Sequence, residues 1–180
     1  SSLAAGPFVP HNCAVSPQDL FESEFFGHRR GSFTGADRDH TGLLVQADSG
    51  VLFLDELEAL PLPHQAKLLR VLDDGEVRPV GSEQPVQVSV RFLAATNLDP
   101  RAMLAEGSLR EDLYYRLRGF EIALPPLAER REDIPELARH FLGQGDPGFQ
   151  SDAMDALQSA SWPGNVRQLR NLVRARSEEH

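Results

Sequence analysis

Two adjacent carboxylates, Asp55 and Glu56, directly follow the apolar run at 51–54 in the string GVLFLDE. Such a run is typical of a strand in a parallel sheet that is covered on both faces. Neighbouring strand residues point to opposite sides, so the two acids leave the strand end in different directions. One carboxylate can bind Mg²⁺ while the other orients an attacking water, as phosphoryl transfer requires. An apolar strand followed by acids is also common without catalysis, so the pattern needs support from other segments.

Two further strand candidates also end in polar residues. The segment 90–97, VRFLAATN, predicts a buried strand that finishes on Thr96 and Asn97. A shorter candidate, which begins FVP at position 8, leads to Asn12. Ligands of open α/β sheets bind beyond the carboxyl ends of the strands, so we expect these side chains and the acid pair to line one crevice.

A glycine-bracketed loop lies in the polar stretch 28–42, and its residues are Gly31, Ser32, Phe33, Thr34, Gly35 and Ala36. A phosphate-binding glycine loop is excluded, because it needs bare backbone N–H groups and a terminal lysine, whereas this loop carries a bulky phenylalanine. Two interpretations stay open. The loop is a hairpin turn whose Phe33 folds back onto the core, or it presents Phe33 and Thr34 to a protein partner.

Two arginines, Arg110 and Arg116, lie in the predicted helical segment LREDLYYRL. Their ordinary interpretation is surface charge that pairs with the acidic neighbours Glu111 and Asp112. A second group of arginines lies in the last predicted helix: Arg167, Arg170, Arg174 and Arg176. We favour stabilisation of the helix C-terminus for this group over a role in binding nucleic acid.

The first two thirds of the chain are predicted to alternate strands and helices. Ser16 and Pro17 begin a helix that ends at Gly27 and buries Leu20 with the phenylalanines at 21 and at 25 or 26. Pro63 begins an amphipathic helix that ends near residue 75. The segment 43–47 is a helix or a strand, 76–88 a loop or hairpin, and 120–124 a last short strand.

The pattern changes near Pro126, and beyond it helices alone are predicted, at 134–142, 151–159 and 165–176. The predicted architecture is an α/β core at residues 1–126, with a parallel sheet flanked by helices. A small helical lid subdomain at residues 127–180 follows it.

The composition, 41% hydrophobic and 25% charged, is that of a globular protein. A net charge of −9 disfavours nucleic-acid phosphate as the main partner and fits contacts with other proteins. No apolar run is long enough to span a membrane, and no signal peptide is recognisable. The single cysteine, Cys13, can form no internal disulfide, so we expect a cytoplasmic protein with Cys13 buried at a strand end.

Taken in order, these segments resemble the AAA+ domain of the bacterial enhancer-binding proteins, the sigma-54-dependent transcriptional activators. ESEFFGH at 22–28 and GSFTGA at 31–36 look like the surface loop that contacts sigma-54 in that family. LFLDE is similar to its Walker B strand and LAATN to its sensor I. LREDLYYRL looks like the arginine-finger region and WPGNVRQL like sensor II. The resemblance covers nearly the whole chain, and a chance coincidence of six motifs in this order is very improbable.

The resemblance implies that ATP and Mg²⁺ are the cofactors and assigns roles to the matching residues. Asp55 would bind Mg²⁺, and Glu56 would activate the attacking water. Asn12 would act as the switch that senses Glu56 when the γ-phosphate is lost. Thr96 and Asn97 would contact the γ-phosphate as sensor I.

The remaining roles implied by the resemblance involve other subunits and partners. Arg110 and Arg116 would reach into a neighbouring subunit's site, and Arg167 would contact nucleotide from the lid. The family would therefore act as a homo-oligomeric ring, with a hexamer expected. Sigma-54 of RNA polymerase is the implied partner of the loop at 31–36, and neither direct DNA binding nor membrane binding is expected of this segment.

Two departures from the family pattern bear on function. The motif GxxxxGK[ST] does not occur, and the only lysine, Lys67, lies on an amphipathic helix. We favour a sequence that begins downstream of this motif, and the alternative is a natural member that has lost it. In either case this chain is expected to bind ATP weakly or not at all. Ser32 replaces the usual alanine of the surface loop and leaves Phe33 and Thr34 in place.

Two functions of different classes are consistent with these residues. The first is an ATP-driven activator domain that remodels sigma-54 RNA polymerase for promoter opening. The alternative is a non-hydrolysing interaction module that retains the sigma-54-contacting loop.

Overall fold

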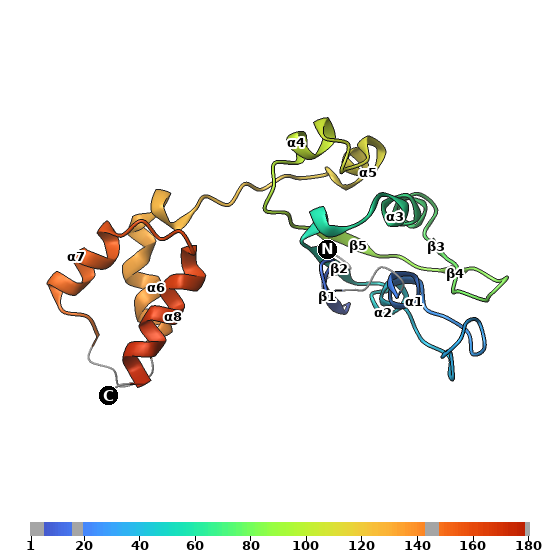
Figure 1. Cartoon of the computed structure of the whole chain (residues 1–180), viewed down its shortest axis with the longest axis horizontal. Helices are drawn as coiled ribbons and strands as arrows, with labels where there is room; N and C mark the ends of the chain where they lie inside the picture. Colours follow the sequence, from blue (N-terminus) through green and yellow to red (C-terminus); the bar gives the residue numbers. More distant parts are fainter. Residues whose placement is uncertain (1–5, 16–19, 143–147, 179–180) are drawn as a thin grey trace. The chain divides into compact units, whose positions relative to one another are not determined.

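The computed structural model describes residues 6–15, 20–142 and 148–178. The chain forms two compact units, residues 1–120 and residues 121–180 (Figure 1). The first unit combines a parallel sheet with helices, and the second is helical. This is the predicted α/β sheet followed by helices alone. The predicted cap at Ser16 and Pro17 lies outside the described residues.

Three parallel strands form the sheet of the first unit, in the order β1-β2-β5. Their bounds are Phe8–Asn12 for β1, Val51–Asp55 for β2 and Arg91–Ala94 for β5. In the central strand, Leu52 and Leu54 are fully buried, while Val51, Phe53 and Asp55 are half-buried. Because strand side chains alternate between faces, β2 turns one leucine face into the main core.

Helices supply the other side of that core. They are α1 (Phe21–Phe26), α2 (Leu43–Gln46), the short 3₁₀ helix η2 (Leu57–Ala59), α3 (Leu62–Asp74), α4 (Pro100–Ala105) and α5 (Glu111–Leu117). The segment that could be helix or strand is therefore helical, as α2. The core around β2 includes Phe25, Leu44 and Leu68, none of which is exposed. Leu20 was expected in this core but is 44% exposed, because it lies at the cap of α1, outside the helix's buried face.

A small antiparallel hairpin precedes β5, as predicted for 76–88. Its strands are β3 (Glu76–Val77) and β4 (Val86–Gln87). Gly75 ends α3 with a φ of 69°, a left-handed conformation that glycine adopts without strain. The Gln87 amide Nε2 donates to the carbonyl oxygen of Asp74 and ties the hairpin to the end of α3.

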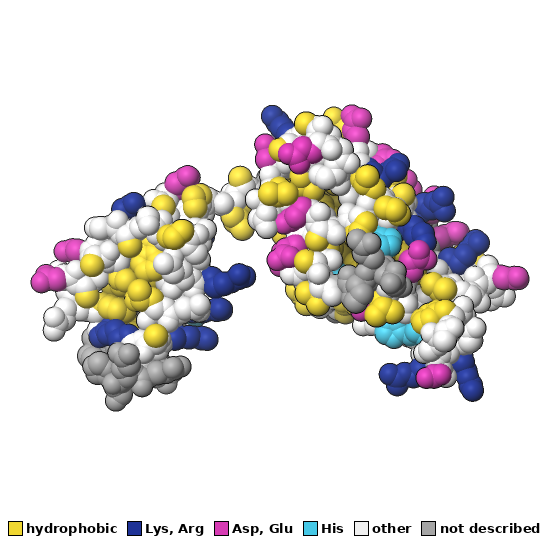
Figure 2. All heavy atoms as spheres, viewed as in Figure 1, with side chains coloured by type: hydrophobic (Ala, Val, Ile, Leu, Met, Phe, Trp, Pro, Cys, Tyr) yellow, Lys and Arg dark blue, Asp and Glu magenta, His cyan; other side chains and the backbone are white. Residues whose placement is uncertain are grey.

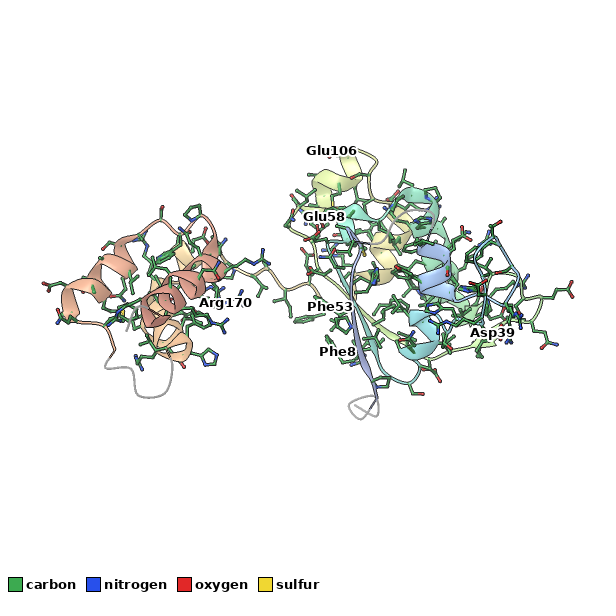
Figure 3. All side chains as sticks on the ribbon, turned by 60° about the horizontal axis from the view of Figure 1, so that its bottom comes forward. Phe8, Asp39, Phe53, Glu58, Glu106 and Arg170 are labelled. Atoms are coloured by element: carbon green, nitrogen blue, oxygen red, sulfur yellow. The ribbon has the colours of Figure 1, made fainter. Side chains whose placement is uncertain are left out.

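A strand was predicted at 90–97 and is present, but the prediction that it is buried is wrong. The strand β5 is shorter than predicted and lies at the edge of the sheet, with Leu93 50% exposed. Phe8 is also exposed and stacks on Phe53 across the neighbouring strands (Figure 3). By the alternation of strand side chains, these three residues share the sheet face opposite the leucine face. That face and the outer edge of β5 have no covering element within the described residues.

The predicted last strand at 120–124 is also wrong. Residues 120–124 have no regular structure, and Phe120, Ile122 and Leu124 are 87%, 70% and 80% exposed. A strand is stabilised by hydrogen bonds to a neighbouring strand. None of the described strands lies beside this segment.

The second unit is a compact group of helices. They are η3 (Leu127–Glu129), η4 (Arg131–Asp133), α6 (Ile134–Phe141), α7 (Ser151–Ser159) and α8 (Asn165–Glu178). The core of this unit contains Leu127, Ile134, Ala138, Leu157, Trp162, Leu169 and Val173. The indole Nε1 of Trp162 donates to the carbonyl oxygen of Leu157 at 2.7 Å, so the buried ring keeps a hydrogen bond.

The helices in the described part of the chain are too short or too polar to cross a bilayer.

His64 in α3 lies flat against Phe21 of α1, with ring centroids 4.0 Å apart. Its Nδ1 is buried and finds no hydrogen-bond partner among the described residues. Burial lowers the pKa of His64 below its ordinary value of 6.5, because a buried imidazolium loses its hydration. The folded chain therefore favours the neutral ring.

This burial predicts a pH-dependent stability. The unfolded chain binds a proton at His64 below pH 6.5 more readily than the folded chain, so the free energy of unfolding should fall as the pH drops below that value. His64→Phe keeps the stacked ring and removes the titrating group. The free energy of unfolding of this variant should therefore fall less on acidification than that of the wild type. Urea unfolding between about pH 7.5 and about pH 5 measures the slope.

The comparison variant is His40→Gln, which removes an exposed histidine. Identical slopes for His64→Phe and the wild type would contradict the prediction. Above pH 6.5 the Phe variant should be as stable as the wild type or more stable by about 1 kcal/mol, because it removes a buried nitrogen without a partner.

Candidate functional site

The acid pair lies where β2 leaves the sheet. Asp55 is the last residue of β2, and its Oδ1 accepts a hydrogen bond from the backbone N–H of Glu56 at 3.0 Å. Glu56 has φ 53° and ψ 52°, a left-handed conformation that is uncommon for a residue with a side chain. The chain therefore turns sharply between the acids, and strained residues of this kind concentrate at functional sites.

Asn12 is the direct neighbour of Asp55 in the sheet. The two residues are register partners at the ends of β1 and β2, and the next N–H, that of Cys13, donates to the Asp55 carbonyl oxygen. The Asn12 side-chain oxygen accepts from the N–H of Ala14 at 2.8 Å. The structure thus brings together two of the residues that the sequence assigned to one crevice.

Cys13 is buried at the end of β1, as predicted. Burial, followed by the negative charges of Asp55, Glu58 and Glu56, raises the pKa of its thiol to about 12. The thiol is therefore protonated at neutral pH and is a poor nucleophile.

Thr96 and Asn97 follow β5 at the same end of the sheet. The Leu54–Ala94 pairing places the ends of β2 and β5 side by side, and the N–H of Leu57 donates to the carbonyl oxygen of Ala95. The Thr96 hydroxyl accepts from the N–H of Leu98 at 3.1 Å and lies 3.7 Å from the Met103 sulfur. Asn97 is exposed. The strand ends therefore place an acid, an amide and a hydroxyl along one edge of the sheet.

This edge suits a magnesium ion that arrives with phosphate. Carboxylate, amide and hydroxyl oxygens are the ligands that Mg²⁺ prefers. Within the described residues, no group of three or more His, Cys, Asp and Glu side chains could hold a metal by itself. Mg²⁺ commonly binds one or two carboxylates together with substrate phosphates, so Asp55 fits as a partial ligand set.

Arg110 precedes α5 and pairs with Asp112, as the ordinary interpretation of this arginine predicted. Its Nε and Nη2 donate to Asp112 Oδ1 and Oδ2 at 3.0 and 2.7 Å. This contact lowers the pKa of Asp112 and raises that of Arg110. Both side chains are more than 40% exposed. An exposed ion pair of this kind contributes little net stability, so the guanidinium can exchange its partner.

Arg116 lies near the end of α5 and contacts the end of α3. Its Nη2 donates to the carbonyl oxygen of Leu72 at 2.8 Å, and its Nε lies 3.1 Å from Asp73 Oδ1. The acidic partner of Arg116 is therefore Asp73, and not Glu111 or Asp112 as its ordinary interpretation predicted. The side chain is 50% exposed, so this guanidinium is also accessible from outside.

Arg167 is exposed in the first turn of α8, in the helical unit. The turn before it contains two left-handed residues, Trp162 and Asn165, with φ of 47° and 49°. The Asn165 Oδ1 accepts from the N–H of Leu127, and the Gln168 Oε1 accepts from the N–H of Gly164. These contacts fix where α8 begins. Arg170 lies one turn further along the same helix (Figure 3).

The glycine-bracketed loop projects from the first unit on a narrow neck. His28 and His40 pair as an isolated antiparallel bridge, and Val80 of the hairpin region pairs with His28 on the other side. Gly31 and Gly35 have φ of 78° and 98°, and a Cβ on either would meet nothing within 4 Å. These positions therefore favour glycine for its backbone conformation rather than for space.

Phe33 does not enter the core. It is 40% exposed and packs edge-on against the His28 ring, with centroids 4.9 Å apart. Thr34 is exposed, whereas Ala36 is buried. Basic and acidic side chains lie at this end of the first unit (Figure 2). Asp39, labelled in Figure 3, accepts a hydrogen bond from the Arg29 side chain. The neck is thus hairpin-like, as one interpretation held, but the tip faces solvent, as the other requires.

Sequence reasoning missed two polar groups near the site. Gln65 is fully buried in α3 and was treated as part of an ordinary amphipathic helix. Glu58 has a buried oxygen, Oε2, without a hydrogen-bond partner in the described part of the chain. Neither residue belongs to a recognisable string, so only the folded structure identifies them.

Comparison with known families assigns nearly the whole chain. The family described as "Sigma-54 interaction domain" matches residues 1–123, and "AAA+ ATPase lid domain" matches residues 128–176. Among curated relatives, the transcriptional regulatory protein GlrR of Escherichia coli is 49% identical over 174 residues, which are 93% of this chain and 39% of GlrR. The transcriptional regulator NtrC of Azospirillum brasilense is 51% identical over 175 residues, covering 94% of this chain and 36% of NtrC. The chain thus spans less than half of these relatives.

Solved structures agree with this assignment. NtrX of Brucella abortus in complex with ATP is 41% identical, with a TM-score of 0.84 over 97% of this chain and 41% of NtrX. Hsp104 is only 17% identical and shares the fold, with a TM-score of 0.66. The chain therefore belongs to the sigma-54 interaction domain family, and its fold is the AAA+ α/β fold followed by a helical lid.

Proposed function

We propose that this chain is the domain of a transcriptional activator that couples ATP binding and hydrolysis to remodelling of sigma-54 RNA polymerase. The observation that carries the proposal is the acid pair at the end of β2, with Asn12 as the register partner of Asp55. The same unit presents an exposed, glycine-bracketed loop. Crystals of NtrX with ATP and with ADP support nucleotide as the ligand of this fold.

Each residue at the sheet edge has a task in this proposal. Asp55 binds Mg²⁺, and Glu56 takes a proton from the attacking water. When bound, Mg²⁺ would supply positive charge beside the phosphates. Thr96 and Asn97 contact the γ-phosphate, and Asn12 senses through Glu56 whether it is present. Arg167 contacts the nucleotide from the lid.

Arg110 and Arg116 act on the nucleotide of a neighbouring subunit in a ring. Both guanidiniums are exposed and held by exchangeable surface contacts. Positive charge near the γ-phosphate supplies much of the catalysis of phosphoryl transfer. A finger from a second subunit makes hydrolysis depend on assembly, and we propose a hexamer.

The loop at 31–36 contacts sigma-54, so the protein acts in the cytoplasm through a protein partner. Direct DNA binding is not proposed for this segment. A non-hydrolysing interaction module remains the alternative, favoured by one observation: the motif GxxxxGK[ST] does not occur in the sequence. ATP hydrolysis by a chimera in which residues 1–180 replace the matching segment of E. coli GlrR tests whether the acid pair and arginines of this chain support hydrolysis. An inactive chimera would favour the alternative.

In that chimera, Thr34→Ala should abolish opening of a sigma-54 promoter while ATP hydrolysis persists. Thr34 is exposed on the loop tip and lies away from the acid pair in sequence. Thr41→Ala, which removes the same hydroxyl beyond the neck, is the control and should preserve both activities. Loss of ATP hydrolysis in parallel with opening would argue against a role in partner contact.

Arg116→Ala should lower the turnover of ATP by roughly 1,000-fold and should not be rescued by more ATP, because a finger acts in the transition state. Arg70→Ala, at an exposed arginine of α3, is the matched control and should keep wild-type turnover. Mixing Arg116→Ala with Glu56→Gln subunits, which keep their fingers, should restore part of the activity. The absence of any recovery in mixed rings would place the arginine's action within one subunit.

The isolated chain should not be stabilised by Mg-ATP. A phosphate loop contributes backbone N–H donors, a helix N-terminus and a lysine to triphosphate binding, and no such motif occurs here. Ligand at about 100 times its Kd would stabilise the fold by about 2.7 kcal/mol, which a thermal-shift titration detects easily. We expect no rise in Tm at millimolar concentrations, and micromolar affinity would show that other residues hold the nucleotide.

A further inference from the structure

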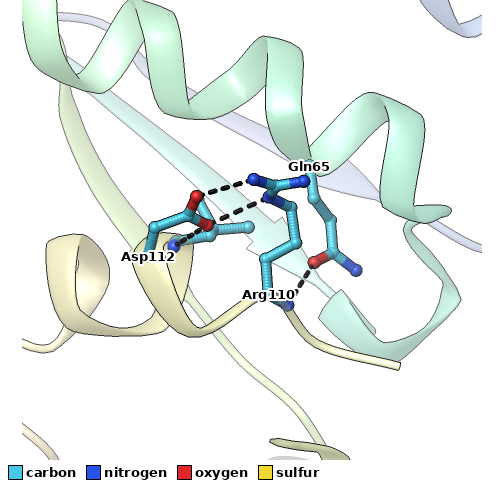
Figure 4. A network of polar contacts seen from close by, with 4 residues as sticks. Gln65, Arg110 and Asp112 are labelled. Carbon is cyan, nitrogen blue, oxygen red and sulfur yellow. Dashed lines mark hydrogen bonds and ion pairs between the residues drawn. The ribbon is translucent and has the colours of Figure 1, made fainter. Parts of the chain in front are cut away.

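Gln65 is a fully buried polar side chain that joins three separate segments (Figure 4). Its Nε2 donates to the carbonyl oxygens of Leu60 and Ser108, both at 2.8 Å. Its Oε1 accepts from the backbone N–H of Arg110 at 2.9 Å. One amide group therefore connects the first turn of α3 to the segment before it and to the turn that begins α5.

The surrounding groups determine the orientation of this amide. Two carbonyl oxygens require the NH₂ group, and one N–H requires the oxygen, so a flipped amide would lose all three hydrogen bonds. An apolar side chain of the same size would leave the N–H of Arg110 and two carbonyl groups without these partners. The side chain is thus specific in chemistry as well as in size.

The three segments belong to different parts of the proposed site. Leu60 ends the short turn that follows Asp55 and Glu56, and the N–H of Leu57 ties that turn to Ala95, just before Thr96. Ser108 ends the turn after α4, where its N–H donates to the carbonyl oxygen of Met103. Gln65 therefore links the backbone around the acid pair to the backbone that begins the arginine-bearing helix.

The third partner, Arg110, is the N-cap residue that directly precedes that helix. Its carbonyl oxygen accepts from the N–H of Tyr114, so its peptide starts the hydrogen bonding of α5. The guanidinium extends outward to Asp112, while the N–H at the base of the same residue is held by Gln65 (Figure 4). Gln65 fixes the base of Arg110 and does not occupy its charged end.

We propose that Gln65 is a positioning residue that couples the acid-pair turn to α5, so that one subunit's site sets the placement of the arginines acting on its neighbour. This inference rests on the proposed function, because it assigns Gln65 to the delivery of Arg110 and Arg116. A change in the turn after Glu56 reaches Arg110 through a single amide. Gln65 is fully buried, so in this proposal it acts through the backbone groups that it holds.

The geometry is tested first in the chain of 180 residues. In Gln65→Met, which keeps the length of the side chain, hydrogen exchange at the Arg110 amide should accelerate by roughly tenfold, since that N–H loses its acceptor. Gln87→Met is the control, because it removes a glutamine amide that bonds to Asp74 and not to Arg110. Gln65→Asn, whose shortened amide cannot reach all three partners, replaces Gln65→Met if the latter does not fold.

The function is tested in the chimera with E. coli GlrR. Gln65→Met should lower kcat for ATP by about tenfold or more with little change in KM, because fingers act in the transition state. In a background that already lacks both fingers, Arg110→Ala with Arg116→Ala, the addition of Gln65→Met should slow turnover no further, since it acts through these two residues. Mixed rings with Glu56→Gln subunits should recover activity, which a subunit that has merely lost its fold would not allow.

The outcomes test the role of Gln65 separately from the proposed function of the arginines. Wild-type turnover in Gln65→Met, beside reduced turnover in Arg110→Ala and Arg116→Ala, would overturn the role of Gln65 alone. Wild-type turnover in both arginine variants would overturn the proposed fingers. Unchanged exchange at the Arg110 amide would overturn the hydrogen bond on which the inference depends.

Discussion

The burial of Leu52 and Leu54 in the central strand determines the direction of every polar group at the end of the sheet. Strand side chains alternate, so a slip of one residue would expose both leucines and turn Phe53 into the core. The hydrophobic effect therefore fixes the register in which Asn12 lies opposite Asp55. The packing of the core therefore also aligns the strand ends at the candidate site.

Features that depend on local sequence were predictable. The stripe of leucines in α3 and the helices of the second unit follow from apolar spacing, which needs no knowledge of distant residues. Gly27 and Gly75 mark helix ends because their φ values are positive. The convergence of Asn12, Asp55 and Thr96 followed from a general property of parallel sheets. Short strings with specific spacing then identified the family.

Features that depend on distant partners were not predictable. The pattern of 90–97 reads as a buried strand, but burial needs a covering layer, and Leu93 faces none among the described residues. The segment 120–124 has the residues of a strand without a neighbour to pair with. A polar residue in a helix gives no sign that its amide will bond to a turn 43 residues away, as Gln65 does. The left-handed conformation of Glu56 could likewise not be predicted, because no glycine stands at this position.

The backbone N–H and the guanidinium of Arg110 differ in how firmly they are held. Its guanidinium forms an ion pair in which both side chains are more than 40% exposed, and water screens such contacts strongly. Its N–H is bonded to a fully buried amide, where breaking the bond would leave polar groups without partners. In the proposed role, the charged end would leave Asp112 for a phosphate while the backbone stays in place. A residue that acts on another molecule needs this combination of a fixed base and an exchangeable end.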